Sequence, residues 1–354
     1  MKTRLNTKLL ALATLLIITI GLSACSESEQ KTKRLTGAGS SFVYPVMSKW
    51  AEDYQQLDGI QINYQSIGSG GGQRQIKAGT IDFAASDQPL EADELAESNL
   101  IQFPIVMGGI IMVVNIPGVD QGQLLLDGQT IASIYQGDIR QWDDERIAIL
   151  NPELDLPDIE IAVIYRADSS GTTYNFADYL AKVDSDWRET MGVSTSLNWP
   201  TGIGAKGNAG VAAYAQTVAG SIGYVEYAYA AENGLNYTQL INQAGVAVTP
   251  TFETFSAAAV NANWQDAENF YLLLTDQPGE QSWPITATTF VLLSSRFEET
   301  EKLEALYTFF RWAYESGATT ARDLDYVPIP EPVYKLVEQT WTNQSANIQN
   351  VDFP

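Results

Sequence analysis

The segment IEIAVIYRADSSGTTYNF, residues 159–176, changes its pattern in the middle. Its first part is rich in β-branched and other apolar residues and ends at Arg166, which is typical of a β-strand. A short glycine-containing turn follows, and a helix is predicted over 173–182. A strand that passes through such a turn into a helix is the repeating unit of α/β proteins. The segment therefore predicts an α/β fold.

The same alternation continues on both sides of this segment. Further strands are predicted in GIQINYQSI (59–67), TIDFAAS (80–86), IVMGGIIMVVNI (105–116) and GSIGYVEY (220–227). Further helices are predicted over 45–56, 208–218 and 302–315. The third of these strand segments is apolar on both faces, so we expect it to form a buried strand pair or central strands.

The N-terminus has the pattern of an export signal. A basic start is followed by an apolar run over 9–20, which is short for a membrane span of roughly 20 residues. Residues 1–24 are therefore predicted to be a signal peptide. Cys25 follows Leu-Ser-Ala, which resembles the lipobox of bacterial lipoproteins, and 25–34 would then be the tether of a lipid anchor. The alternative is an ordinary signal cleaved near Ala24.

Composition excludes several classes of protein. The formal net charge of the 354 residues is −23, and cleavage of the signal would make it more negative, so binding of nucleic acid or an anionic membrane is not expected. The chain has no histidine, which excludes a Ser-His-Asp triad and a histidine-ligated zinc site. Its single cysteine excludes a disulfide within the chain. The length is typical of about two domains.

Three small, polar turns follow predicted strands and open predicted helices. They are TGAGSSFVYP (36–45), SIGSGGGQRQ (66–75) and YRADSSGTTY (165–174). The free N–H groups of a helix N-terminus can bind an anion, and in open α/β sheets ligands bind where such turns gather. Each turn by itself could equally be an ordinary helix cap. None completes a phosphate-binding P-loop or a dinucleotide fingerprint, so nucleotide binding is not predicted.

Taken together, these turns and other segments resemble the high-affinity phosphate-binding proteins of bacterial ABC importers. The segments QFPIVMGGIIMVVNIPG, RADSSGTT, GNAGVAAYAQ, GSIGYVEYAYA and WPITATTF follow in the family's order. The resemblance implies an extracytoplasmic receptor, in the periplasm or on the outer face of the cell membrane. Such a receptor delivers inorganic phosphate to a membrane permease and its ATPase. It is not an enzyme, and it needs neither a cofactor nor a metal.

The resemblance also implies the architecture. The family has the type II periplasmic-binding-protein fold, with two lobes hinged by crossover strands and the ligand in the cleft between them. The first lobe would comprise 35–113 and 287–354, and the second lobe would be 114–286.

The site residues that the resemblance implies come from both lobes. They are Ser41, Phe42 through its backbone N–H, Ser69, Asp87, Arg166, Ser170, Gly171 and Thr172, with Asp168 as the partner of the arginine. Ser41 stands where the family usually has threonine, and Gly70 where serine is common. The first change keeps the hydroxyl donor.

The chemistry of these residues suits a protonated anion. A buried anion needs a balancing charge, which Arg166 would supply while Asp168 orients its guanidinium; the alternative is a surface ion pair. Asp87 should repel an anion unless that anion carries a proton to donate. Phosphate is protonated near neutral pH and sulfate is not, so an acceptor-only carboxylate would select phosphate. Asp87 could also cap the following helix.

Other functions remain open on the sequence alone. The receptor could take another tetrahedral oxyanion, such as sulfate or molybdate, although Asp87 disfavours this. An extracytoplasmic phosphatase would need a nucleophile with a base or a metal cluster, and neither is evident. A surface lipoprotein for adhesion or signalling is the third alternative. Lys206 could be a second cation of the site or a solvated side chain, and Arg74 is expected at the surface.

Overall fold

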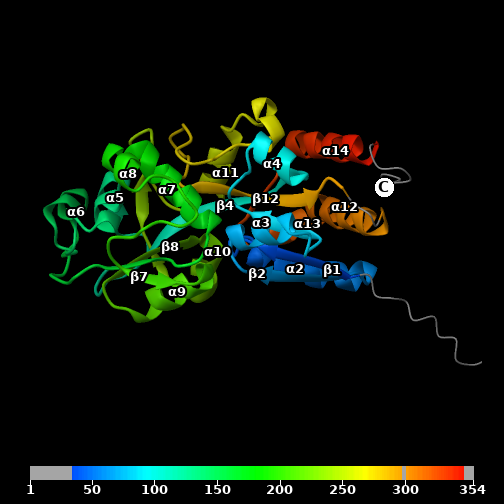
Figure 1. Cartoon of the computed structure of the whole chain (residues 1–354). Coiled ribbons are helices and arrows are strands. Elements are labelled where there is room, and N and C mark those ends of the chain that lie inside the picture. Colours follow the sequence, from blue (N-terminus) through cyan, green and yellow to red (C-terminus); the bar gives the residue numbers. More distant parts are fainter. Residues whose placement is uncertain (1–33, 297–299, 347–354) are drawn as a thin grey trace, which may run out of the picture. The chain divides into compact units, whose positions relative to one another are not determined.

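The protein is described by a computed structural model that covers residues 34–296 and 300–346 (Figure 1). The predicted signal peptide (1–24) and Cys25 lie outside the described residues. The predicted tether (25–34) does too, except for its last residue, because Arg34 already begins the first strand. Among the described residues, no helix combines the length and the apolar character that crossing a membrane requires.

One large mixed sheet organises the chain, which confirms the α/β class. Its strands lie in the order β2-β1-β3-β12-β4-β8-β6-β7, with β9 and β13 also paired to β4. The bounds are β1 (Arg34–Gly39), β2 (Gln61–Ser66), β3 (Phe83–Ser86), β4 (Leu100–Asn115), β6 (Ala162–Arg166), β7 (Ile203–Ala205), β8 (Ser221–Glu226), β9 (Asn236–Tyr237), β12 (Thr286–Ser294) and β13 (Val327–Pro328). A small second sheet contains β5 (Leu125–Leu126), β10 (Gln239–Ile241) and β11 (Ala247–Val248).

Strand β4 joins the two ends of the large sheet. Its first ten residues, Leu100–Gly109, pair with β12, and the remainder, Ile110–Asn115, pairs with β8. We expected IVMGGIIMVVNI to be a strand pair or central strands, and the structure shows a single central strand that begins earlier, at Leu100. A run of apolar residues without a turn cannot reverse direction, so the chain continues from one half of the sheet into the other.

The helices surround both ends of the sheet, and the four predicted helices are confirmed. These are α2 (Tyr44–Asp58), α7 (Gly171–Val183), α9 (Gly207–Thr217) and α12 (Thr300–Glu315). The other helices are α3 (Ser69–Lys77), α4 (Ala92–Ser98), α5 (Gly128–Gln136), α6 (Glu145–Leu150), α8 (Ser185–Thr190), α10 (Tyr227–Asn233), α11 (Phe252–Val260), α13 (Gly317–Asp323) and α14 (Glu331–Ala346), with 3-10 turns η1 (Trp264–Asp266) and η2 (Glu268–Phe270). In Figure 1, α2, α3, α12, α13 and α14 lie around one end of the sheet and α5 to α9 around the other.

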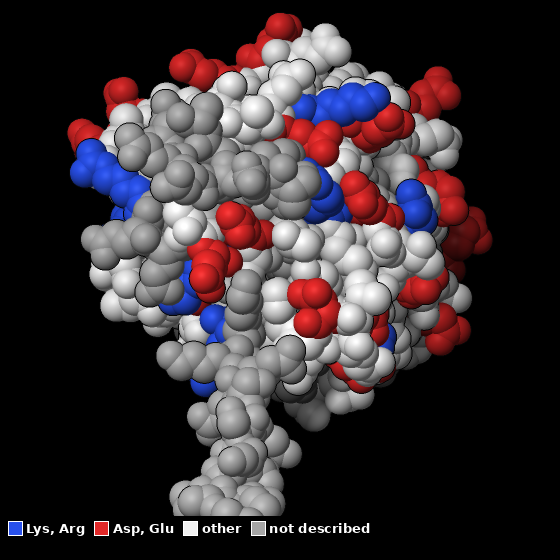
Figure 2. Space-filling model, turned by 90° about the vertical axis from the view of Figure 1, so that its right-hand side faces the viewer, with Lys and Arg blue, Asp and Glu red and all other residues white. Residues whose placement is uncertain are grey.

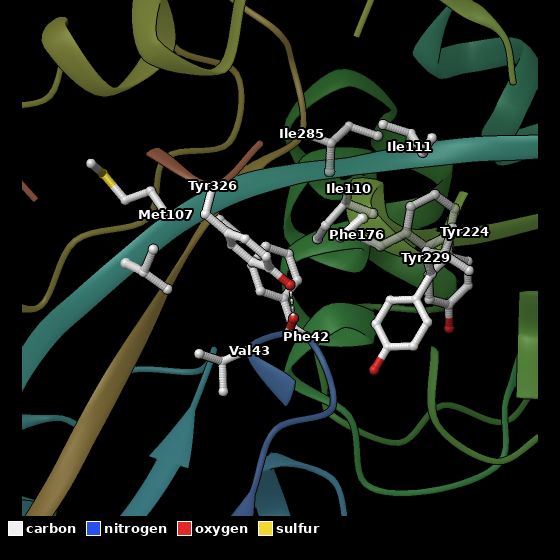
Figure 3. Close-up of a cluster of buried hydrophobic side chains, with 14 of the residues drawn as sticks. Phe42, Val43, Met107, Ile110, Ile111, Phe176, Tyr224, Tyr229, Ile285 and Tyr326 are labelled. Atoms are coloured by element: carbon white, nitrogen blue, oxygen red, sulfur yellow. Dashed lines mark hydrogen bonds between the residues drawn. The ribbon is translucent and has the colours of Figure 1, made fainter. Parts of the chain in front are cut away.

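A continuous apolar core runs along β4 (Figure 3). Phe42 and Tyr326 meet edge to face with their ring centroids 6.1 Å apart, and the Tyr326 hydroxyl donates to the Phe42 carbonyl over 2.6 Å. Farther along β4, Phe176 stacks on Tyr224 with centroids 4.3 Å apart. Gly109 in β4 makes room for an aromatic ring, since an added Cβ would lie 2.1 Å from the ring of Phe255. Packing against this core along β4 therefore fixes the positions of the turns after β1 and β6.

The predicted lobe boundaries fall at the strands that join the two halves. The boundary between 113 and 114 lies inside β4, and the boundary between 286 and 287 lies at the start of β12. The described residues from Arg34 onward form one compact unit, so the division into 35–113, 114–286 and 287–354 stays a prediction.

Candidate anion-binding site

The predicted site residues meet at the carboxyl ends of the strands. Strands β1, β2 and β3 are parallel neighbours, so the turns that follow them share one edge of the sheet. The turn after β6 lies against this edge, because the Gly70 N–H donates to the Ser169 carbonyl over 3.1 Å. All the predicted ligands are buried, namely Ser41, Phe42, Ser69, Asp87, Arg166, Ser170, Gly171 and Thr172. The structure thus brings together residues that are up to 131 positions apart in the sequence.

Asp87 is a buried carboxylate surrounded by hydroxyl donors. Its Oδ2 accepts from Ser40 over 2.6 Å and from Ser69 over 3.4 Å, and its Oδ1 accepts from Thr289 over 2.8 Å. Burial raises the pKa of Asp87 to about 6, although these hydroxyls and the charge of Arg166 act to lower it. A group with this pKa is ionised at neutral pH, so Asp87 can accept hydrogen bonds there but cannot donate one.

Arg166 and Asp168 form a buried, two-point ion pair. Arg166 Nε donates to Asp168 Oδ1 over 2.8 Å and Nη2 donates to Oδ2 over 2.6 Å. The Arg166 side chain is only 1% exposed, so the alternative of a surface pair is wrong. Burial acts to raise the pKa of Asp168, but the bonds and charge of Arg166 and the Gly207 N–H outweigh it and lower that pKa. The pair leaves Nη1 as the guanidinium nitrogen directed to the Thr172 hydroxyl, at 3.2 Å.

Helix α7 presents its N-terminus to Asp87 and Ser69. Ser170 caps this helix by accepting the Thr173 N–H over 3.1 Å, so the interpretation as a cap is also correct. The first N–H groups of a helix have no partner within it, and here they belong to Gly171 and the residue after it. Gly171 is packed so tightly that an added Cβ would lie 2.4 Å from Ser69 Oγ and 2.8 Å from Asp87 Oδ2.

Residues 26–312 match the family described as the PBP superfamily domain. The curated relatives include the phosphate-binding proteins PstS of Xylella fastidiosa (strain 9a5c), with 47% identity over 90% of this chain and 88% of the relative. They also include PstS of Pasteurella multocida (strain Pm70), with 48% identity over 89% of this chain and 91% of the relative. This chain belongs to the PstS family of phosphate-binding proteins.

Solved structures show that the fold is that of this superfamily. The phosphate-bound PfluDING protein, a high-affinity periplasmic phosphate-binding protein, matches with a TM-score of 0.70 and 20% identity, over 86% of this chain and 93% of that one. An ABC-type phosphate transport receptor from Vibrio cholerae matches with a TM-score of 0.55 and 20% identity, over 84% of this chain and 100% of that one. The predicted two-lobed periplasmic-binding-protein fold is therefore confirmed, and like other PstS-like proteins this one is extracytoplasmic.

Three polar residues of the site were missed by reasoning from the PstS sequence pattern. Ser40 and Thr289 donate to Asp87, and Asn208 contacts both halves of the site. The Asn208 amide donates to Ser41 Oγ over 2.9 Å and to Thr172 Oγ1 over 3.3 Å. The double serine of TGAGSSF was a signal for Ser40. Nothing local distinguishes Thr289 from its neighbours, because it reaches Asp87 only through the pairing of β12 with β3.

The other two charged candidates in this PstS protein lie at the edge of the cluster: a Cβ added to Gly70 would be 3.4 Å from Arg74 Nη1, and Lys206 precedes Gly207, whose N–H donates to Asp168 Oδ1. Lys206 is exposed at the start of α9, and Arg74 is exposed on α3. Lys206 is therefore a solvated side chain and not a second buried cation. The Phe42 N–H, predicted to face the ligand, donates to Ser40 Oγ over 2.9 Å. The described residues contain no group of three acidic or cysteine side chains arranged to hold a metal ion.

Proposed function

We propose that this chain captures inorganic phosphate outside the cytoplasm and delivers it to the permease and ATPase of an ABC importer. The observation that carries the proposal is that one buried cluster contains both a cationic donor and a carboxylate acceptor. Arg166 provides a fixed positive charge, and Asp87 provides an ionised acceptor whose Oδ2 lies beside the N-terminus of α7. An anion that still carries a proton satisfies both groups, because its oxygens accept from the donors while its own hydrogen goes to Asp87.

The predicted residues take the following roles in this proposal. The hydroxyls of Ser41, Ser69, Ser170 and Thr172 and the N–H groups of Phe42 and Gly171 donate to phosphate oxygens. Arg166 balances the charge of the anion, with Asp168 holding its guanidinium in place. Phe42 can donate to phosphate if its N–H turns from Ser40 or is shared with it. Buried anions need such a complete set of donors, since desolvation otherwise opposes binding.

Titration calorimetry with phosphate and then with sulfate tests this function. The protein would be residues 26–354, which leaves out the predicted signal and Cys25. We expect one tightly bound phosphate per chain and little competition from sulfate. Equal affinity for the two anions would show a general oxyanion receptor and would contradict the role of Asp87. The same outcome would favour the alternative of a sulfate or molybdate receptor.

Three further predictions extend this proposal. We infer that the protein is a receptor without catalytic activity, since the chain has no histidine for a hydrolytic triad and the described residues contain no acidic or cysteine cluster arranged to hold a metal ion. Cys25 would carry the lipid anchor, and 35–113 with 287–354 would form one lobe around the insert 114–286. A Cys25→Ala variant should move the protein from the membrane fraction to the aqueous fraction of cells, and unchanged partitioning would argue for an ordinary cleaved signal instead.

A further inference from the structure

Ser40 lies between two groups of the site and uses all its polar atoms. It follows β1, is 1% exposed, and its hydroxyl donates to Asp87 Oδ2 over 2.6 Å. The same oxygen accepts the Phe42 N–H over 2.9 Å. The Ser40 N–H donates to the Ala85 carbonyl over 2.8 Å, and its own carbonyl accepts from the Tyr64 hydroxyl over 2.8 Å. A hydroxyl has one hydrogen, and here that hydrogen goes to the carboxylate.

The bond from Ser40 is the shortest that Asp87 accepts. Ser69 approaches the same carboxylate oxygen only to 3.4 Å, and its oxygen already accepts the Asp87 N–H over 3.1 Å. Thr289 serves the other oxygen. Bonds of this kind stabilise the ionised carboxylate over the protonated acid, because the acid form gives up part of its acceptor capacity.

Few other charged or titratable groups face Asp87. Arg166, at the end of β6, favours the carboxylate through its charge. Tyr64 from β2 and Tyr326 beside β13 are the titratable neighbours, and burial raises the pKa of both phenols well above the usual value, so they stay neutral. The elements α3, α7 and β12 contribute only hydroxyl, amide and backbone groups, such as the Asn175 amide that donates to the Asp87 carbonyl over 2.7 Å. Ser40 is thus the principal hydrogen-bond donor that lowers the pKa of Asp87 against the effect of burial.

We propose that Ser40 is a specificity-determining residue, whose hydroxyl keeps Asp87 an ionised acceptor and so sets the pH below which sulfate is no longer rejected. The inference rests on the proposed function. Below the pKa of Asp87, which is about 6, the carboxyl carries a hydrogen and can donate it to sulfate. Removal of the Ser40 hydroxyl destabilises the carboxylate. The change from rejection to acceptance of sulfate would then occur at a higher pH.

Calorimetric titrations of the wild type and a Ser40→Ala variant with phosphate and with sulfate, from about pH 5 to about pH 8, test the inference. The readout is the ratio of the sulfate to the phosphate dissociation constant, because loss of Ser40 also frees the Phe42 N–H, and that donor serves either anion. In the wild type we expect the ratio to fall as the pH drops through about 6. In Ser40→Ala the fall should move upward by about one pH unit or more. A Ser40→Gly variant also lacks the hydroxyl and should give the same shift.

Two controls separate the hydroxyl from a packing effect. Ser40→Thr keeps the hydroxyl, so the ratio of the sulfate to the phosphate dissociation constant should fall at the same pH as in the wild type. Thr288→Val removes a buried hydroxyl that has no partner and does not touch Asp87, and it should also leave that pH unchanged. The inference is overturned if the ratio falls at the same pH in Ser40→Ala and Ser40→Gly as in the wild type. It is also overturned if the pH of this fall moves upward in Ser40→Thr as much as in those two variants. A wild type that binds no phosphate at any pH would instead overturn the proposed function and the inference with it.

Discussion

Gly171 and Ser69 lie so close together that a Cβ added to Gly171 would stand 2.4 Å from the Ser69 hydroxyl oxygen. Gly171 opens α7 and Ser69 opens α3, so this contact joins the N-termini of two helices that are about a hundred residues apart in the chain. Approach at this distance leaves no room for a side chain. The identity of residue 171 therefore limits how closely the two turns can meet.

A Gly171→Ala substitution should weaken phosphate binding strongly while leaving the protein folded. The added methyl would collide with Ser69 and Asp87, and the two turns would have to separate, which lengthens every hydrogen bond across the site. The matched control is Gly210→Ala in α9, whose Cβ would meet its nearest atom at an ordinary 3.5 Å. Calorimetry should show a loss of about tenfold or more for the first variant only. Equal affinities would mean that the site does not need this close approach.

Arg166→Ala should abolish measurable binding at ordinary phosphate concentrations. Truncation of one partner of a buried, hydrogen-bonded charge pair costs about 2–5 kcal/mol of binding energy, and here it also leaves Asp168 without its partner. Arg146→Ala is the control, because Arg146 also pairs with an aspartate two residues away, Asp144, but at the surface. Phosphate binding should be unchanged in that control. Near-normal affinity in Arg166→Ala would remove this arginine from the site.

Asp87→Asn should relax the rejection of sulfate. An amide can donate a hydrogen bond where the carboxylate can only accept one, so sulfate would gain a partner instead of facing a negative charge. We expect sulfate affinity to rise about tenfold or more, with a smaller change for phosphate. Competition calorimetry at neutral pH measures both. Unchanged selectivity would count against Asp87 as the residue that recognises the proton of phosphate.

Glu226→Gln should remove part of the pH dependence of stability. Glu226 is fully buried at the end of β8, and its Oε1 has no hydrogen-bond partner. Its Oε2 lies 2.9 Å from the Tyr326 hydroxyl, which also lies 2.6 Å from the Phe42 carbonyl. A phenol has one hydrogen, so a protonated Glu226 is needed for both bonds to form.

Burial raises the pKa of Glu226 well above its usual 4.5. Since the folded state then binds more protons than the unfolded state, the free energy of unfolding falls as the pH rises from about 4.5 toward the folded pKa. The slope is at most about 1.4 kcal/mol per pH unit for one proton. Urea unfolding across this range should show a steeper decline for the wild type than for Glu226→Gln. Parallel curves would mean that Glu226 has a similar pKa in the folded and unfolded states.

The rate of phosphate association should rise modestly with salt. The formal net charge is −23, and acidic side chains are spread over the face that Figure 2 shows, with fewer basic ones between them. Long-range repulsion of the anion is screened at higher ionic strength, since the Debye length is about 10 Å at 0.1 M, while contacts inside the buried cluster are screened little. Stopped-flow fluorescence would measure the rate. A rate that falls with salt would reveal a locally positive entrance.

The local parts of the site could be predicted from the sequence because they depend on neighbours in the chain. Arg166 and Asp168 are two residues apart at the end of a strand, so their pairing follows from local geometry. Ser170 precedes the helix that it caps. The three turns over 36–45, 66–75 and 165–174 were recognisable in the same way, from glycine and serine between a predicted strand and a helix.

Only the tertiary structure decided which distant groups complete the cluster. Thr289 reaches Asp87 across 202 positions, and Asn208 reaches Ser41 across 167. The single strand β4 likewise depends on having β12 beside one half and β8 beside the other. The sequence by itself determined the three turns, the Ser170 cap of α7 and the Arg166–Asp168 pair, because these need only a few consecutive residues. The environment of Asp87 was decided by strand pairing and by burial, which are properties of the whole fold and set whether a carboxyl group there is an acceptor or a donor.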